Sequence, residues 1–184
     1  MDREREKLRD AALVKQGREG NKLALEQLVG LYHRPVYNLA YRIVGDVEMS
    51  QDVTQSTFLR AFEKLAQFNP EYKFFSWLYR IAVNEAIDQV KSRDQFTATD
   101  GSELSNSDTE AVIFGQEQSE QIRQAMGKLH DDYRTVITLR HFSELSYDEI
   151  SEVLVLPVKT VRSRLYSARQ LLKTHLDNQG YSFR

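Results

Sequence analysis

The chain has 184 residues, of which 41% are hydrophobic and 28% charged, with a net charge of −2, as in a folded globular protein. It has no cysteine and four scattered histidines, which excludes disulfides, thiolate chemistry and a zinc finger, and we expect no metal site and no cofactor. No apolar run approaches the roughly 20 residues that span a bilayer, so we expect no membrane insertion and a cytoplasmic location.

Helical periodicity dominates the first 93 residues, where nothing alternates as a strand does. Gly17 and Gly20 are expected to end a charged first helix, and Gly45 a second one in which Pro35 predicts a break or a kink. Asp46 is the expected cap of a third helix. Its expected buried positions are Val53, Thr57, Leu59, Ala61, Phe62 and Leu65, while Asp52 and Gln55 occupy another face.

Aromatic residues crowd the next segment, which holds Phe68, Tyr72, Phe74, Phe75, Trp77 and Tyr79. Ser76 is the expected cap of a fourth helix, and one face of this helix combines Trp77, Arg80, Asn84, Asp88 and Lys91. Aromatic and cationic groups together suit single-stranded DNA, because unpaired bases stack on aromatic rings. The alternative is that most of the rings belong to the core, which is the better interpretation for Phe74, Phe75 and Tyr79.

The composition changes at residues 94–120, which hold seven acidic residues and no Lys or Arg, whereas the segments on both sides are net positive. Ser, Thr, Asp and Gly are frequent there and apolar periodicity is weak, which indicates a linker. We therefore expect an all-α protein of two small helical domains, residues 1–93 and 121–184, joined by a flexible acidic linker over 94–120.

Two short helices joined by a tight turn are predicted over residues 145–172. Ser146 and Glu149 have the spacing of a capping box at the start of the first helix, and Pro157 presets the start of the second. One stripe of the second helix is apolar and consists of Val161, Leu165, Ala168 and Leu172. Residues 157–173 contain five Lys or Arg and no acidic residue. This pattern is typical of a helix-turn-helix DNA reader, although a solvated basic face on an ordinary bundle would look the same.

Three segments, in this order, resemble the extracytoplasmic-function sigma factors, small bacterial sigma subunits that consist of domains two and four and a linker. The first, DVTQSTFLRAF from Asp52 to Phe62, resembles the region that docks on the clamp helices of core RNA polymerase. The second, FSWLYRIAVN from Phe75 to Asn84, resembles the promoter-melting and minus-ten element. The third, LSYDEISEVLVLPVKTVRSRLYSAR, resembles the domain that reads the minus-35 element.

The resemblance implies a subunit that itself makes and breaks no bond. It would bind the clamp helices and flap of core polymerase, read double-stranded DNA at minus-35, and capture an unpaired base of the single-stranded minus-ten element. It also implies an anti-sigma factor as a partner. For the acidic linker it suggests a path through the active-site cleft and RNA exit channel of polymerase, and the alternative is a merely solvated spacer.

The same resemblance assigns candidate residues to three contacts. Those for core polymerase are Asp52, Gln55 and Leu59. Those for minus-ten recognition and melting are Asn69, Tyr72, Lys73, Trp77, Arg80 and Asn84. At minus-35, Arg162, Ser163 and Tyr166 would lie near base edges, and Lys159, Thr160, Arg164 and Arg169 near phosphates.

Some residues depart from the family pattern. Val155 stands where Gly, Asn or Asp is frequent, and a β-branched residue is poorly suited to positive φ, so we expect a differently built turn. Lys159 and Ser167 replace a usual Gly and a usual Arg, and we therefore expect an altered minus-35 preference.

Two other classes of function compete with this interpretation. A self-contained helix-turn-helix repressor or activator would need a sensor or dimerisation module, but no receiver-like alternation and no heptad run precedes the linker. An enzyme has less support, because the sequence contains no Gly-rich phosphate loop, no nucleophile motif and no paired His and carboxylate spacing.

Overall fold

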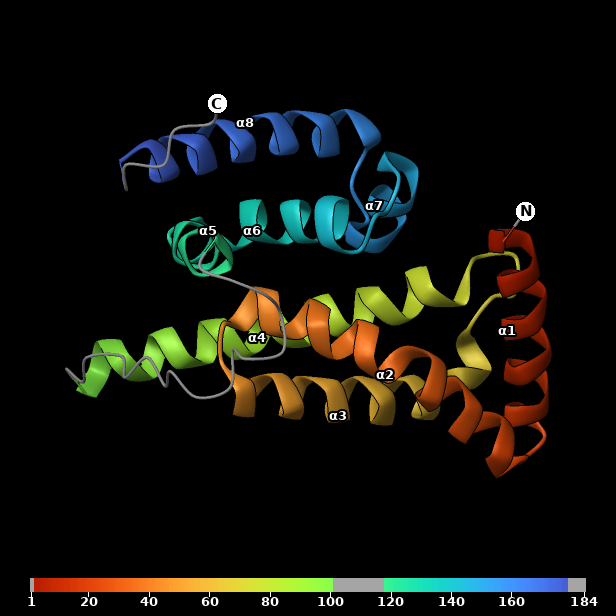
Figure 1. Cartoon of the computed structure of the whole chain (residues 1–184). Helices are drawn as coiled ribbons and strands as arrows, with labels where there is room; N and C mark the ends of the chain where they lie inside the picture. Colours follow the sequence, from red (N-terminus) through yellow and green to blue (C-terminus); the bar gives the residue numbers. More distant parts are fainter. Residues whose placement is uncertain (1, 101–117, 179–184) are drawn as a thin grey trace.

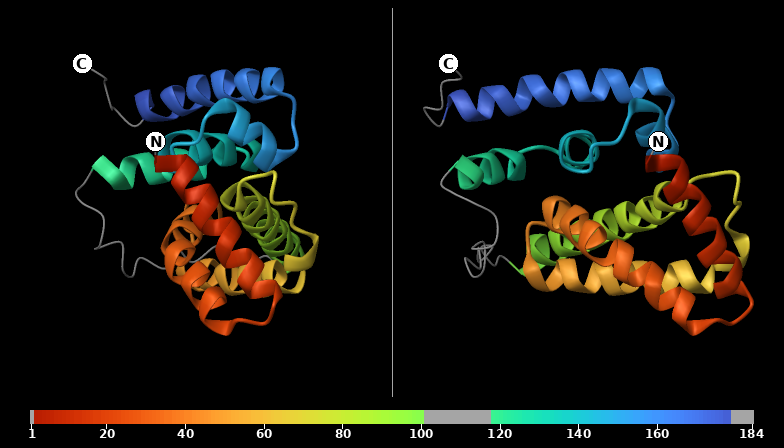
Figure 2. Two further views of the ribbon diagram at one scale, coloured as in Figure 1. Left: turned by 90° about the vertical axis from the view of Figure 1, so that its right-hand side faces the viewer. Right: turned by 45° about the vertical axis from the view of Figure 1, so that its right-hand side comes forward.

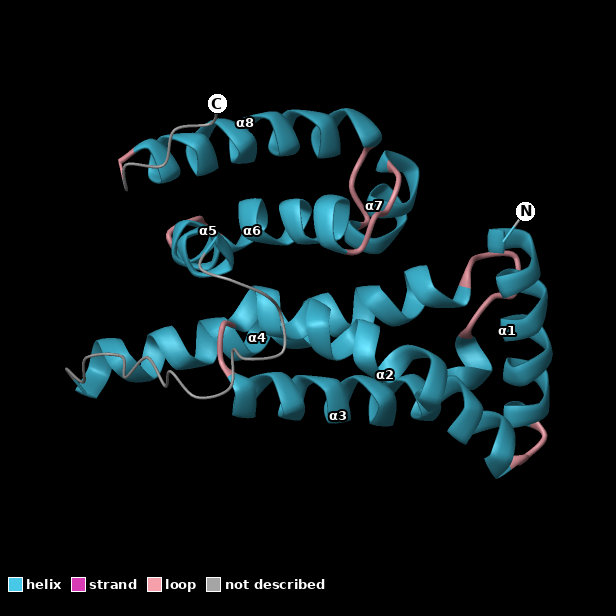
Figure 3. Ribbon diagram, viewed as in Figure 1, coloured by secondary structure: helices cyan, strands magenta, loops and turns pink. Residues whose placement is uncertain are grey.

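The structure, a computed structural model, describes residues 2–100 and 118–178, and all regular elements in these ranges are helices (Figure 1, Figure 3). The expected all-α fold is confirmed. In chain order the elements are α1 (Asp2–Arg18), α2 (Lys22–Val44), α3 (Val47–Glu63), the 3₁₀ turn η1 (Leu65–Gln67), α4 (Phe74–Asp100), α5 (Gln118–Gly127), α6 (Asp131–Ile137), the π-helical turn η3 (Thr138–Phe142), α7 (Tyr147–Leu154) and α8 (Val158–Asp177). None of these described helices is long and apolar enough to cross a bilayer.

The amino-terminal half is a bundle of α2, α3 and α4, and α1 crosses one end of it (Figure 1). Its centre contains the fully buried side chains of Leu28, Leu39 and Leu78. A polar contact fastens α1 to α2, because the buried carboxylate of Asp10 accepts a hydrogen bond from the hydroxyl of Tyr32. Burial, together with this hydrogen bond, raises the pKa of Tyr32 above its usual range, so the ring stays neutral in the folded protein.

The carboxy-terminal half places α8 along the outside, with α5, α6 and α7 beneath it (Figure 1, Figure 2). Leu139, Ile150 and Leu165, from η3, α7 and α8, fill its interior. The interior is continuous with the apolar core of the first half, because α4 and α2 contact α7, α6 and η3. The two halves therefore pack directly on each other.

The predicted helix ends are largely confirmed by their hydrogen bonds. The backbone N–H of Met49 donates to the Asp46 carboxylate at 2.8 Å, and Gly45 ends α2 with a φ of +74°. The capping box at the start of α7 is complete: Ser146 N–H donates to Glu149 Oε2 at 2.8 Å, and Glu149 N–H donates to Ser146 Oγ at 3.2 Å. Local chemistry therefore sets these boundaries.

Other local predictions were wrong. The predicted break at Pro35 was wrong, because α2 continues through the proline and its buried face continues on both sides, from Leu28 to Leu39. The alternative, a kink at Pro35, stays a prediction. Ser76 is no cap: α4 begins at Phe74, whose side chain is buried, and Trp77 N–H bonds back to the carbonyl of Lys73 at 3.3 Å. Packing of the ring thus outweighs the capping preference of serine.

The predicted linker over 94–120 lies mainly outside the described residues. Residues 94–100 form the last part of α4, and residues 118–120 form the start of α5. The division of the chain into one domain that ends at residue 93 and another that begins at residue 121 stays a prediction.

The turn between α7 and α8 is built on a left-handed residue. We expected Val155 to avoid positive φ, and this was wrong: its φ is +54° and its ψ +46°. Val155 N–H and Leu156 N–H both donate to the carbonyl of Ser151, so the turn closes α7 with its backbone polar groups paired. The side chain of Val155 is 68% exposed, so neighbouring residues crowd it little. The remaining cost is the local clash of Cβ with the backbone.

Relieving this strain should stabilise the protein. We expect Val155→Asn to raise the free energy of unfolding by about 1 kcal/mol, because asparagine tolerates the left-handed region. Chemical denaturation monitored by circular dichroism measures the change. Val155→Ala retains a Cβ and is the control, with a smaller effect. Equal stability of Val155→Asn and the parent chain would contradict the strain.

Candidate nucleic-acid interface

The base-reading candidates lie on the outward face of α8. Arg162, Ser163 and Tyr166 are exposed, and Tyr166 is 67% exposed although it is aromatic. The opposite face of the helix, which contains Val161, Leu165 and Ala168, is buried as predicted. This burial fixes the rotation of α8 about its axis, so the basic face points away from the protein.

Neighbouring groups hold several of these side chains in place. The ring of Tyr147 lies 5.2 Å from the guanidinium carbon of Arg140 and 5.7 Å from that of Arg162. Arg164, a predicted phosphate contact, is paired with Asp132 of α6 at 3.1 Å. Of the remaining phosphate candidates, Lys159 is exposed, Thr160 is partly buried and Arg169 reaches His141 on η3 at 3.3 Å.

His141 itself lies among cations. Its partial burial lowers the pKa of its imidazole, and the charges of Arg169 and Arg140 lower it further. The ring is therefore neutral at neutral pH and can accept the hydrogen bond from the Arg169 guanidinium.

The aromatic segment is mostly core. Phe68, Phe74 and Trp77 form a cluster with centroid distances of 5.3 to 5.7 Å, and Phe74 and Tyr79 are buried. Burial raises the pKa of Tyr79 to about 12. Among the rings of this segment only Tyr72, which lies in the loop before α4, is largely exposed, at 58%. The structure therefore confirms the core interpretation for Phe74 and Tyr79, and leaves Tyr72 as the ring open for stacking.

The remaining minus-ten candidates lie in the loop before α4 and along the first three turns of that helix. Asn69 is exposed and forms a local turn, since its side-chain oxygen accepts from Glu71 N–H at 3.0 Å. Asn84 is exposed and lies at the edge of a polar cleft of about 1040 Å³, which the two halves line together. Lys73 and Arg80 contact α7: Lys73 Nζ lies 2.7 Å from Glu149 Oε1, and Arg80 Nε donates to the carbonyl of Glu152 at 3.1 Å.

A groove on the far side of the bundle brings together two of the three polymerase candidates. Its volume is about 400 Å³ and apolar side chains from α2 and α3 line it, among them Val29, Phe58 and Phe62. Gln55 and Leu59 lie on its rim, and Leu59 is 57% exposed rather than buried as its apolar character predicted. Asp52 is exposed but does not line the groove.

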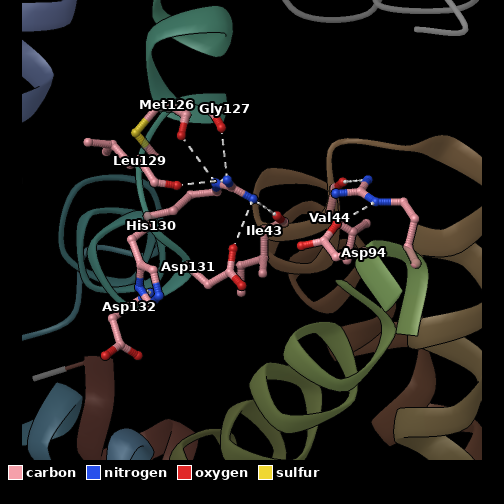
Figure 4. A network of polar contacts seen from close by, with 11 residues as sticks. Ile43, Val44, Asp94, Met126, Gly127, Leu129, His130, Asp131 and Asp132 are labelled. Atoms are coloured by element: carbon pink, nitrogen blue, oxygen red, sulfur yellow. Dashed lines mark hydrogen bonds and ion pairs between the residues drawn. The ribbon is translucent and has the colours of Figure 1, made fainter. Parts of the chain in front are cut away.

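Arg134 joins the two halves through hydrogen bonds to carbonyls of both, and Figure 4 labels the residues that carry these acceptors. Its guanidinium donates to the carbonyl of Ile43 in α2 at 2.7 Å, and it faces the Asp131 carboxylate at 3.5 Å. Burial lowers the pKa of Arg134 from its ordinary value. Its other acceptors are the carbonyls of Met126, Gly127 and Leu129.

Sequence reasoning did not identify the groups that join the two halves. Arg134 and Arg42, whose guanidinium carbon lies 3.6 Å above the ring of Phe142, bind groups that are far away in the chain. The capping box accounts for Glu149 in the sequence, and nothing there indicates its second partner, Lys73. No local signal marks such contacts, because a carbonyl acceptor is present at every residue.

Comparison with known proteins matches both halves of the chain to one family. Sigma-70 region 2 matches residues 28–96, and Sigma-70, region 4 matches residues 119–172. The chain is 34% identical to the ECF RNA polymerase sigma factor SigW of Bacillus subtilis, over 89% of this chain and 94% of that protein. It is also 34% identical to the ECF RNA polymerase sigma-E factor of Haemophilus influenzae, over 93% and 97% respectively.

Solved structures share its architecture. The chain superposes on CnrH, solved in complex with the cytosolic domain of CnrY, with a TM-score of 0.72 and 29% identity, over 92% of this chain and 98% of that one. The sigma factor RpoE of Bartonella quintana, solved in complex with the anti-sigma factor NepR, gives the same TM-score at 23% identity, over 83% and 96%. At 23% identity, the likeness to RpoE supports the fold alone.

Proposed function

The chain belongs to the extracytoplasmic-function sigma factors, and from that premise we propose which of its surfaces carry out the steps of promoter recognition. As a member of this family it is a transcription initiation factor that acts with RNA polymerase. A self-contained helix-turn-helix regulator would have no use for sigma region 2, which occupies residues 28–96. We further propose that the protein works in the cytoplasm and catalyses no reaction of its own.

The outward basic face of α8 supports the minus-35 contact most directly. A helix with its apolar stripe buried can enter the major groove, where an arginine can bind the O6 and N7 of guanine with two hydrogen bonds. Arg162 is exposed beside Tyr166 on this face and is the proposed base reader. Lys159 and Arg169 are proposed phosphate contacts, which position the helix without reading the sequence.

The loop before α4 and the first turns of that helix are the proposed minus-ten site. Tyr72 offers an exposed ring for stacking, Lys73 and Arg80 offer cations for the strand backbone, and Asn84 offers an amide for a base edge. Trp77 packs in the aromatic cluster and would support the site from within. Capture of an unpaired base offsets the few kcal/mol lost on unstacking and so favours the melted promoter.

The apolar groove of α2 and α3 is the proposed docking site for the clamp helices of core polymerase. The exposed side chain of Leu59 and the groove lined by Phe58 and Phe62 offer apolar surface, and removal of this surface from water on docking would favour binding. The flap is the proposed contact of the carboxy-terminal half.

A protein inhibitor is also proposed. CnrH, 29% identical to this chain, was solved with the cytosolic domain of another protein, CnrY. We infer that this chain likewise has a protein partner, an anti-sigma factor.

Transcription by the reconstituted enzyme tests the proposed function. We expect purified chain to bind core RNA polymerase and to direct run-off transcription from a promoter library, with shared minus-35 and minus-ten sequences upstream of the recovered start sites. Specific binding of duplex DNA by the chain without polymerase, and no transcription with it, would instead favour a self-contained regulator.

Arg162→Ala should relax minus-35 specificity. We expect the holoenzyme to lose about 1 to 3 kcal/mol of discrimination between promoters with matched and scrambled minus-35 sequences, as competition binding measures. Lys159→Ala is the matched control, because loss of a phosphate contact weakens binding to both promoters alike. Equal losses on both promoters for Arg162→Ala would remove its assignment as a base reader.

Leu59→Asp should weaken docking on core polymerase. Loss of an apolar anchor and burial of a charge are expected to lower the affinity by about tenfold or more, measured by fluorescence titration of core polymerase. Leu8→Asp is the control, since Leu8 is 65% exposed on α1 and does not line the groove. The same affinity for both variants would place the docking site elsewhere.

A further inference from the structure

A histidine that belongs to none of the predicted sites contacts a proposed minus-35 residue. His141 on η3 is exposed, and its Nε2 accepts a hydrogen bond from the Nε of Arg169 at 3.3 Å. The Nη2 of the same guanidinium lies 3.2 Å from this ring nitrogen. The two residues are 28 positions apart in the chain, so the contact depends on the fold, and the helix-turn-helix pattern assigns His141 no role.

Arg169 lies on the same face of α8 as the proposed base reader. Arg162, Tyr166 and Arg169 follow one another at spacings of four and three residues, and all three are exposed. Seven residues of helix span about 10 Å. The major groove is about 12 Å wide, so a side chain this far along α8 from Arg162 can reach the phosphates at the edge of the groove.

η3 holds His141 in a fixed place. Leu139 of this turn is buried, and the guanidinium of Arg140 donates to a backbone carbonyl of the loop before α7 at 2.7 Å. On the other side of His141, the ring centroid of Phe142 lies 3.6 Å from the guanidinium carbon of Arg42 on α2. The residues before and after His141 are therefore anchored, and its ring can serve as a fixed acceptor.

The imidazole orients the Arg169 guanidinium without neutralising its charge. Partial burial and the charges of Arg169 and Arg140 lower the pKa of His141, so the ring is neutral at neutral pH and Nε2 can accept. A guanidinium has five donors, and those that do not face Nε2 remain for a phosphate. Arg164 differs, because its partner at 3.1 Å is the carboxylate of Asp132, which competes with a phosphate.

We propose that His141 is a positioning residue of the minus-35 contact, which holds the guanidinium of Arg169 ready for a DNA phosphate before the duplex binds. The inference rests on the proposed phosphate contact of Arg169. An exposed arginine loses side-chain freedom when it binds, and a side chain that is already held loses less. Loss of the imidazole therefore weakens the phosphate contact, although His141 itself touches no DNA.

Two substitutions of His141 separate the acceptor from the bulk of the ring. His141→Leu retains an apolar side chain of similar size without an acceptor, whereas the amide oxygen of His141→Gln can replace Nε2. Arg169→Ala and the double variant with His141→Leu complete a double-mutant cycle. His141 is exposed, so we expect all variants to keep the melting temperature of the parent chain, as circular dichroism measures.

The affinity of the assembled holoenzyme for promoter DNA is measured at a series of salt concentrations. One promoter carries the minus-35 sequence recovered by transcription, and the other a scrambled sequence. Loss of a phosphate contact lowers the steepness of log binding constant against log salt concentration by about 0.9. We expect this change for Arg169→Ala, and a smaller one for His141→Leu with binding about threefold to tenfold weaker on both promoters. His141→Gln should bind as the parent chain does, and the double variant as Arg169→Ala does.

The contrary results are distinct. Parent affinity and salt dependence in His141→Leu, with a lowered salt dependence in Arg169→Ala, would overturn the positioning role. Losses that add in the double variant would show that His141 does not act through Arg169, and equal losses in His141→Gln and His141→Leu would show that no acceptor is needed. An unchanged salt dependence in Arg169→Ala would instead remove the proposed phosphate contact, and with it the premise of the inference.

Discussion

Every helix ends in carbonyl groups that have no donor within the helix, and the architecture of this chain depends on how arginines satisfy them. A guanidinium offers five donors in a planar fork and can bind several carbonyls at once. Each of these arginines comes from a segment remote in sequence, so each one also ties two elements together. The pairs are Arg93 with Val44, Arg134 with Ile43, and Arg80 with Glu152.

These ties explain why two small halves form one body. Arg134 gathers carbonyls at the end of α5 and at the end of α2, so it fastens the halves where both have unsatisfied acceptors. Arg80 does the same between α4 and the end of α7. The junction therefore combines these polar contacts with the apolar contacts that make the two cores continuous.

The sequence predicted what local chemistry decides and missed what distant packing decides. The caps at Asp46 and at Ser146, and the buried stripe of α8, follow from neighbours a few residues away. The start of α4 was misplaced because burial of Phe74 outweighed the preference of Ser76, and Val155 accepts a strained φ because its turn is fixed by the backbone bonds on both sides. The sequence does not indicate the contacts of these arginines, because their acceptors are backbone carbonyls, which every residue type has.

The arginine contacts at the junction of the two halves are insensitive to acidity. Arginine guanidinium groups stay protonated across the physiological pH range, and backbone carbonyls do not titrate. Ions in solution screen the pair of Lys73 and Glu149 only weakly, because the Glu149 side chain is 4% exposed and buried pairs are screened much less than exposed ones. A change of ionic strength alone would therefore leave this contact between α4 and α7 in place.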